Sequence, residues 1–537
     1  AQLGGIAVAT SVTRPGSILM NTTQAASGVD GNVVLGPSSL LAILPDESGG
    51  TLPTSTVNST TSVNGGSNVP YFRAVLQPQI SIQAAGSVDI HGNGAGLGGA
   101  LIKAPSAALT IAAGAAPGAT TAGAGTILLE PGSTIDLSGL AGVTLPMSIN
   151  EISVKITPAE VADDPLARSL IGKTVTIDAR LSGTRADGSQ WVGSPILDVA
   201  GYVGLIPESI DQILTVGGSF TSSARTFIQQ PGAAINVSGG SVQYLGGFIN
   251  TTRVLGADGR IYNLGNADPT IAYVGVLDGF TVDHAHWGVT DVYASPLISG
   301  GYYEPGYVAG ANAGSIGVTA YTPILAGDIV ADIVAGTRQR AQAGSSNLAA
   351  ADQMPAGGSL SVSFANPLQS GNTNNVVLES QADAGADPYG LSSLTSANWS
   401  TWTPTLATPP GAASPVFPIF SDLLSNASLA SISIKGANTL SMPANASLAV
   451  LPGGSITLDG VTTIDGTLST PAGKISLTGF TYAGGASLNP MLLPPTPAVV
   501  IGPDALLYVA GLWVNDSGLM PDQMQGQAFI NGGSEIG

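Results

Sequence analysis

Apolar and polar residues alternate in short runs along most of the chain, and one nine-residue pattern recurs with the form Pro-x-x-x-(Ile/Leu)-x-(Val/Leu)-x-Gly. Its two apolar residues are two positions apart, so they point to the same face of an extended strand. The proline and small residues before them predict a turn, and the closing glycine allows a sharp bend. The copies are PGSTIDLSG at Pro131, PGAAINVSG at Pro231, PGGSITLDG at Pro452, PAGKISLTG at Pro471 and PDALLYVAG at Pro503.

The spacing of two copies indicates how the strands are arranged. Those at Pro452 and Pro471 begin 19 residues apart, and TLDGVTTIDGTLST between them supplies two further alternating segments. A circuit of about 20 residues with three short strands is the size of one coil of a parallel β-helix. Because one coil cannot bury its own inward row, neighbouring coils must stack at about 4.8 Å. The pattern therefore predicts an all-β protein with a parallel β-helix, or solenoid.

A β-sandwich is the alternative architecture, since sandwiches also combine short strands with Gly and Pro turns. The β-helix is favoured because sandwiches do not repeat one turn-and-strand pattern.

Two regions interrupt the alternation. Residues 141–310 hold much of the charge and aromatic content, and PAEVADDPLARSLIG, from Pro158 to Gly172, is the best candidate for a short helix. Residues 365–425 are rich in Pro, Ser and Asn, which predicts an excursion along the outside of the coils. We therefore divide the chain into five parts. They are N-terminal coils (1–140), coils with inserts (141–310), further coils (311–364), the excursion (365–425) and C-terminal coils (426–537).

Composition narrows the class of protein. Only 9% of the 537 residues are charged, and cysteine is absent, so disulfides and cysteine-ligated metals are excluded. With 34 acidic and 15 basic residues the net charge is −19, which disfavours binding to a nucleic-acid backbone. No apolar run approaches the roughly 20 residues of a membrane helix. The first residues, AQLGGIAVAT, lack a basic secretory n-region, so we expect any signal segment to lie outside this sequence.

The middle of the chain contains four segments whose sequences are more characteristic of a particular protein family than the nine-residue repeat is. They are LDVAGYVGLIPESIDQILTVGGSF, GGSVQYLGGFINTTRVLGADGRIYNLGNADPTIAYVG, GFTVDHAHWGVT and GGYYEPGYVAGANAGSIGV. Over about residues 130–360 the chain resembles filamentous-haemagglutinin-family outer-membrane proteins of proteobacteria, in particular a domain of unknown function toward the C-terminal side of these exoproteins. The resemblance implies a right-handed parallel β-helix, two-partner-type export through an outer-membrane transporter, and a role in adhesion or matrix formation. It brings no catalytic residues.

A β-helical polysaccharide lyase or hydrolase is the alternative function. Such chemistry needs paired carboxylates, or a basic residue near metal-binding carboxylates, on one face of a sheet. The nearest match is TVDHAHWG, where Asp283, His284 and His286 are of residue types that ligate metals. Because no Arg-x-x-Arg or Arg-x-Lys follows nearby, we expect these side chains to bond the loop backbone instead.

The sequence predicts a non-enzymatic extracellular structural protein on the bacterial cell surface, either an adhesin or the subunit of a self-assembling biofilm-matrix filament. No catalytic, cofactor-binding or metal-binding residue is assigned, and no cofactor is expected. Expected partners are further copies, stacked end to end, and a glycan, host or abiotic surface. The candidate contact residues are the aromatic side chains Trp287, Tyr302, Tyr303, Tyr307, Trp399 and Trp402.

Overall fold

The computed structural model describes residues 2–11, 15–23, 31–49, 60–63, 67–70, 77–93, 98–114, 124–185, 188, 190–199, 202, 208–277, 280–284, 289–293, 301–339, 353–365, 375–406, 408, 415–479, 499–514, 529–531 and 534–535. Strands form most of the regular structure in these residues, and no helix there exceeds six residues. The prediction of an all-β protein is therefore confirmed. The helical turns are η1 (Glu47–Gly49), η3 (Met147–Asn150), η4 (Pro165–Leu170), α3 (Ile210–Ile213), η5 (Leu264–Asn266), α4 (Gln381–Ala384), η7 (Leu391–Ser393) and α5 (Ser421–Ser425).

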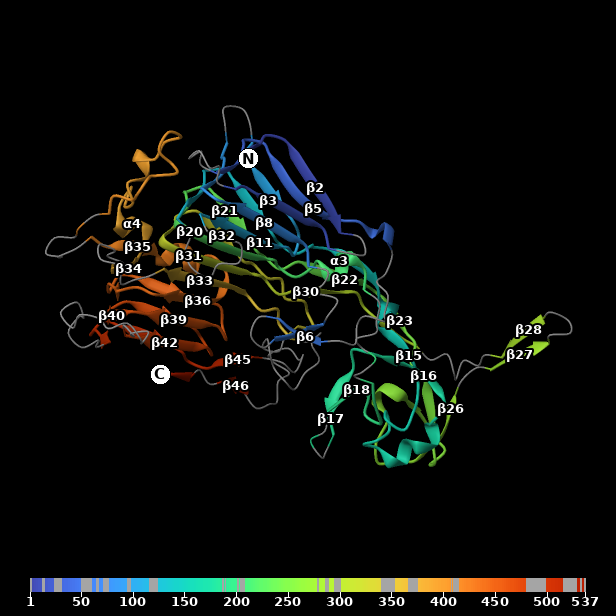
Figure 1. The fold of residues 1–537 in the computed structure, drawn as a ribbon. Coiled ribbons are helices and arrows are strands. Elements are labelled where there is room, and N and C mark those ends of the chain that lie inside the picture. Colours follow the sequence, from blue (N-terminus) through green and yellow to red (C-terminus); the bar gives the residue numbers. More distant parts are fainter. Residues whose placement is uncertain are drawn as a thin grey trace, which may run out of the picture.

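The largest sheet of the described residues has 14 strands, and its strand pairs are parallel. In Figure 1 its strands lie side by side, and their colours change in chain order from blue to red. Its members are β1 (Gln2–Leu3), β3 (Ser17–Asn21), β4 (Val33–Leu35), β8 (Gln79–Ala84), β9 (Val88–Ile90), β11 (Ala108–Ala113), β12 (Thr126–Leu129), β20 (Ser219–Gln229), β31 (Ser315–Leu325), β33 (Gly358–Phe364), β36 (Leu429–Lys435), β39 (Ser455–Asp459), β42 (Lys474–Thr478) and β47 (Ser534–Glu535).

In the first part of the chain, a strand of the large sheet is followed, after a turn, by a strand of a second parallel sheet. The chain passes from β4 to β5, from β9 to β10 and from β12 to β13, and each later strand pairs beside the earlier one. The six strands of this sheet are β2 (Ile6–Ser11), β5 (Leu40–Pro45), β10 (Leu101–Lys103), β13 (Thr134–Asp136), β21 (Ala234–Asn236) and β32 (Asp328–Val330).

In the last part of the chain, three parallel sheets are visited in turn. From β36 onward the order is large sheet, five-stranded sheet, three-stranded sheet, and then the large sheet again. The five-stranded sheet contains β34 (Asn375–Glu379), β35 (Phe417–Phe420), β37 (Thr439–Met442), β40 (Val461–Ile464) and β43 (Val500–Ile501). The three-stranded sheet contains β38 (Ser447–Ala449), β41 (Thr467–Ser469) and β44 (Leu506–Tyr508).

Two pairs of copies of the nine-residue pattern form strands that pair directly with each other. The copies at Pro131 and Pro231 become β13 and β21, which pair directly with Ile135 opposite Ile235. Those at Pro452 and Pro471 become β39 and β42, with Ile456 opposite Ile475. In the 19 residues between them the chain visits each of the three sheets once, and we call one such circuit a passage.

The closing glycine of the pattern is required by close packing between turns. A Cβ atom on Gly139 would overlap the carbonyl oxygen of Thr215, and one on Gly239 would overlap that of Ala311. These positions therefore exclude any side chain.

The inward-facing side chains of the parallel sheets form one apolar cluster that extends from Val33 to Leu477. Strand β33 shows the underlying pattern, since its buried residues alternate with half-buried ones along its length. The repeated strands stabilise the folded chain mainly by burying this continuous row of apolar side chains.

Residues 150–199 and 250–277 leave the parallel sheets and form a separate lobe, at the lower right in Figure 1. Its strands are antiparallel, and they enclose a second apolar cluster that includes Val175, Leu264 and Tyr273. These strands are β15 (Glu151–Lys155), β16 (Thr174–Asp178), β17 (Ser182–Thr184), β18 (Gln190–Ser194), β19 (Leu197–Asp198), β24 (Arg253–Gly256), β25 (Ile261–Asn263) and β26 (Tyr273–Leu277).

Small sheets connect the lobe to the large sheets or extend from them. Strands β14 (Val143–Pro146), β22 (Ser241–Leu245) and β30 (Tyr307–Gly310) form one, and β23 (Gly247–Ile249) pairs with β29 (Tyr302–Glu304) in another. The remaining pairs are β6 (Thr60–Val63) with β7 (Ser67–Pro70), β27 (Phe280–His284) with β28 (Val289–Tyr293), and β45 (Leu512–Val514) with β46 (Phe529–Asn531).

Two local expectations differ from the structure. The predicted excursion 365–425 contains β34 and β35, which pair in a parallel sheet, and its residues Tyr389 and Trp402 belong to the large apolar cluster. The predicted helix is limited to η4, because Pro165 stands at its first turn and the Asp164 carboxylate accepts a hydrogen bond from the Leu166 N–H.

Candidate functional site

Three ionisable side chains, Asp89, His91 and Glu130, meet where two neighbouring parallel strands end. Asp89 lies in β9 and His91 follows that strand, so the two side chains leave the same face. Strand β9 pairs with β12, and the Glu130 N–H donates to the Ile90 carbonyl oxygen at 3.0 Å. The stacking register therefore places the carboxylate of Glu130 beside the imidazole of His91.

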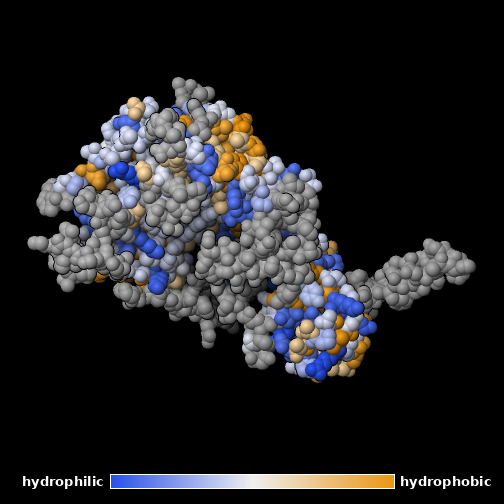
Figure 2. Space-filling model, in the orientation of Figure 1, coloured by the Kyte–Doolittle hydropathy of each residue, from blue (hydrophilic) through white to orange (hydrophobic). Residues whose placement is uncertain are grey.

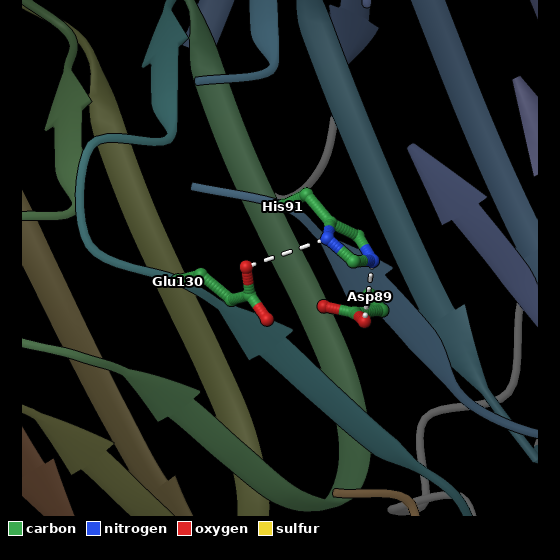
Figure 3. Close-up of side chains that lie close together, drawn as sticks. All are labelled: Asp89, His91 and Glu130. Carbon is green, nitrogen blue, oxygen red and sulfur yellow. Dashed lines mark ion pairs between the residues drawn. The ribbon is translucent and has the colours of Figure 1, made fainter. Parts of the chain in front are cut away.

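The imidazole of His91 lies between the two carboxylates, as Figure 3 shows. Its Nε2 atom is 3.1 Å from Oδ2 of Asp89, and its Nδ1 atom is 3.5 Å from Oε2 of Glu130. The same Glu130 oxygen accepts a hydrogen bond of 2.9 Å from the Gly92 N–H. One ligand atom from each of the three residues lies within 4.8 Å of the other two.

Asp89 is the buried member of the cluster, with 3% of its surface exposed. Its cross-strand neighbours are Val34 and Leu128, so it interrupts an otherwise apolar row. Burial raises the pKa of Asp89 to about 7; the nearby His91 lowers it, and Glu130 raises it further. Its second oxygen, Oδ1, has no hydrogen-bond partner among the described residues. The cluster can therefore hold a proton or a cation.

A second ionic cluster lies where the lobe joins the parallel sheets, and it is centred on Arg180. The guanidinium group donates to both oxygens of Asp178, at 2.9 and 2.7 Å, and to Oε1 of Glu304 at 2.9 Å. Arg338 donates to the same oxygen of Glu304 at 2.6 Å. Burial alone would lower the pKa of Arg180, but the hydrogen bonds with Asp178 and Glu304 outweigh it and raise that pKa. This cluster is a structural junction with its charges paired.

The candidate tyrosines lie beside this junction, in strands instead of loops. Tyr303 is 59% exposed, and its ring contacts Phe248 edge-on at 5.5 Å. Tyr302 is also exposed, and its hydroxyl donates to Oδ2 of Asp178 at 3.0 Å. Tyr307 is buried and stacks on Tyr244 at 4.8 Å, so its ring is not available for a surface contact.

The candidate tryptophans have different positions. Trp402 is buried, and its Nε1–H donates to Oγ of Ser393 at 2.9 Å. Trp399 is half-buried against the large apolar cluster. Trp287 lies outside the described residues, as does His286. The backbone of Asp283 and His284 is part of strand β27, but their side chains lie outside the part of the chain that the structure describes.

A groove of about 510 Å³ runs between η1, β14 and α3, and Glu47 and Asp211 are among the residues that line it. The Asp211 N–H donates to Oε1 of Glu47 at 2.9 Å. Burial, followed by the charge and a hydrogen bond of Glu47, raises the pKa of Asp211.

Neither ionic cluster was predicted from the sequence. Asp89 and His91 carry a local signal, since an Asp-x-His spacing in a strand places both side chains on one face. Glu130 carries none, because its approach depends on which strand stacks beside β9. The same holds for Arg180, in the turn after β16, and Glu304, at the end of β29, which are 124 residues apart in the chain.

No helix among the residues that the structure describes has the length and apolar character needed to cross a membrane. In comparisons with known proteins, no protein-family model, no curated protein and no solved structure matches the chain. The resemblance to the filamentous-haemagglutinin family therefore stays a prediction from the sequence.

Proposed function

We propose that this chain is a non-enzymatic extracellular structural protein of the filamentous-haemagglutinin type. In this proposal it is a right-handed parallel β-helix that reaches the bacterial cell surface through an outer-membrane transporter and acts there as a filament subunit or an adhesin.

The regular passage between parallel sheets supports the β-helix. Strands β36 to β44 visit the three sheets in constant order, and every strand of one passage pairs with the corresponding strand of the next. A parallel crossover within one sheet is right-handed in about 98% of cases. The handedness is tested by an experimental density map that resolves the connections from β39 to β42.

The observation that carries the proposed assembly is the exposure of apolar side chains on the outermost described strands. Strand β2 ends the six-stranded sheet, and its Ile6 and Val8 are 71% and 51% exposed. Figure 2 shows this apolar area over β2 and β5. Strand β43 ends the five-stranded sheet, where Val500 and Ile501 are also exposed. An uncovered strand edge has unpaired N–H and C=O groups that accept a further strand.

A second copy of the chain fits these edges. Because the strands of the four large stacked sheets are all parallel, the last strands of one copy run in the same direction as the first strands of another in a head-to-tail contact. Head-to-tail contacts of this kind repeat without closing and produce a filament.

The test is negative-stain electron microscopy with sedimentation over a range of protein concentration. We expect rods that lengthen with concentration. Val8→Lys should shorten them, because a lysine on an edge strand opposes pairing. Ile261→Lys is the matched control, since Ile261 is an exposed apolar residue of the lobe. Single short rods at every concentration would contradict the filament.

An adhesive role is the second candidate, and the pair Phe248 and Tyr303 favours it. Both rings are exposed, at 61% and 59%, on the antiparallel pair β23 and β29. Exposed aromatic rings provide apolar faces on which sugars stack. Binding to immobilised glycans should fall in Tyr303→Ala and persist in Tyr508→Ala, an exposed tyrosine on β44. Equal binding by both variants would argue against this contact surface.

A polysaccharide-active enzyme remains the rival proposal. It requires release of unsaturated or reducing sugar ends by the purified chain, with loss of that activity in Asp283→Asn or His284→Gln. The two carboxyl groups in the groove, tested by Glu47→Gln, are the other residues to examine for such activity.

A further inference from the structure

We propose that Asp89, His91 and Glu130 form a binding site for a divalent transition-metal cation of the Zn²⁺ type. The proposal is independent of the proposed function, because it rests on side chains that neither assembly nor adhesion uses. In it, the cation joins two neighbouring passages of the chain, with Asp89 and His91 on one and Glu130 on the next.

The types of ligand indicate which cation is expected. One imidazole nitrogen and two carboxylate oxygens suit Zn²⁺ and similar borderline metals, whereas Mg²⁺ and Ca²⁺ prefer oxygen ligands alone. Three protein ligands leave a further coordination position for water.

The geometry is close to that of a bound state. In a tetrahedral zinc site the ligand atoms lie about 2.0 to 2.2 Å from the metal, and hence roughly 3.5 Å from each other. Ligand atoms of the three residues already lie within 4.8 Å. The side chains of His91 and Glu130 are 30% and 28% exposed, so they are free to approach by the remaining ångström, while Asp89 is held in its strand.

The buried oxygen Oδ1 of Asp89 is an independent indication of a ligand. It has no hydrogen-bond partner among the described residues, and it belongs to a carboxylate with 3% exposure between apolar neighbours. In Figure 3 this oxygen is directed toward Glu130, into the space between the three side chains. Leaving such an atom unpaired costs free energy, and a cation bound there removes that cost.

The competing explanation is an ion triad without metal, in which a protonated imidazole bridges the two carboxylates. That arrangement uses Oδ2 of Asp89 and leaves Oδ1 unpaired, so it does not account for the buried oxygen. It also predicts no selectivity among divalent cations.

The experiment titrates the full chain, stripped with a chelator and dialysed at 0.15 M salt, with Zn²⁺ in a calorimeter and with Co²⁺ in an absorption spectrometer. We expect one tight site per chain, at least tenfold weaker binding in His91→Gln and in Asp89→Asn, and Co²⁺ bands typical of nitrogen and oxygen ligands. Zn²⁺ should also raise the unfolding temperature until the site is saturated.

Two controls separate this site from general attraction to a chain of charge −19. Asp328→Asn removes an exposed carboxylate from β32 and should leave Zn²⁺ affinity unchanged. Glu130→Gln changes a partly exposed side chain, so it provides a folded variant if Asp89→Asn does not fold. Equal affinities of His91→Gln, Glu130→Gln and the parent chain would overturn the proposal, as would equal binding of Zn²⁺ and Mg²⁺.

Discussion

The parallel sheets and the lobe bury their apolar side chains in different ways. In the parallel sheets each strand pairs with the corresponding strand of the next passage, and one apolar cluster runs through the whole set. In the lobe, antiparallel strands from residues 150–199 and 250–277 enclose a small cluster of their own. Between these two segments the chain returns to the parallel sheets to form β20 and β21.

This difference shows what repetition does and does not provide. Stacked passages extend the molecule with few charged residues, because each new strand only has to match the row beneath it. The lobe has no such template, and its attachment uses the paired charges around Arg180 together with Met147, Ile249 and Tyr307. The two regions are therefore expected to unfold as separate units.

The largest expected effects come from emptying the two apolar clusters. Phe227→Ala, in the parallel sheets, should cost about 3 to 5 kcal/mol of unfolding free energy, because it leaves a large cavity. Leu264→Ala should cost about 2 to 5 kcal/mol, confined to the lobe. Scanning calorimetry should show each variant lowering a different transition. A single transition, shifted alike by both variants, would mean that the molecule is one cooperative unit.

Arg180→Ala tests the junction between the regions. Removing the guanidinium leaves the buried Asp178 carboxylate without its bidentate partner, so we expect a loss of about 3 to 4 kcal/mol. Hydrogen exchange should increase first in β16, β29 and β30.

The exposed Arg260 provides the control for that experiment. Arg260→Ala, in the lobe, should change stability by no more than about 0.5 kcal/mol. If the two arginine variants have the same stability, the cluster around Arg180 does not hold the lobe.

The pH dependence of stability should differ between the regions because of Asp89. Its pKa is about 7 in the folded chain and near the ordinary value of 3.8 in the unfolded one. Between these values the folded state keeps a proton that the unfolded state releases, so the unfolding free energy falls as pH rises from about 4 to 7. In metal-free buffer we expect a loss on the order of 2 to 3 kcal/mol in the transition of the parallel sheets.

Asp89→Asn is the matching variant, since asparagine keeps the shape but has no proton to lose. Its parallel sheets should lack this part of the pH dependence, while the lobe transition stays the same. An unchanged slope would show that Asp89 ionises near its ordinary pKa in the folded chain.

The smallest expected effect concerns the N-terminal cap of the helical turn η4 in the lobe. Asp164→Ala removes the acceptor for the Leu166 N–H at the start of η4 and should cost about 1 kcal/mol in the lobe transition alone. Asp164→Ser retains an acceptor and should recover most of this loss, as measured by the same calorimetry. A full loss in both variants would assign the effect to packing instead of capping.

Part of the fold could be predicted because it depends on local rules. The alternation in PGSTIDLSG and its copies predicted strands with inward Ile135 and Leu137, and both side chains are buried. Strand β34 was not predicted, since its NVVLE segment lies in a region rich in Pro, Ser and Asn, where composition suggested irregular structure. The lobe was recognised only as an interruption.

The sequence by itself determined the strands of the repeated pattern and their inward rows, because a period of two and a turn before each strand act over a few residues. Only the tertiary structure decided which strands are neighbours. Pro131 and Pro231 begin adjacent strands although the lobe segment 150–199 lies between them. Glu130 reaches His91 through the same stacking, and Glu304 of β29 reaches Arg180 where the lobe joins the small sheets. Contacts between passages depend on the length of every intervening insert and on the register of the sheets, which no local pattern encodes.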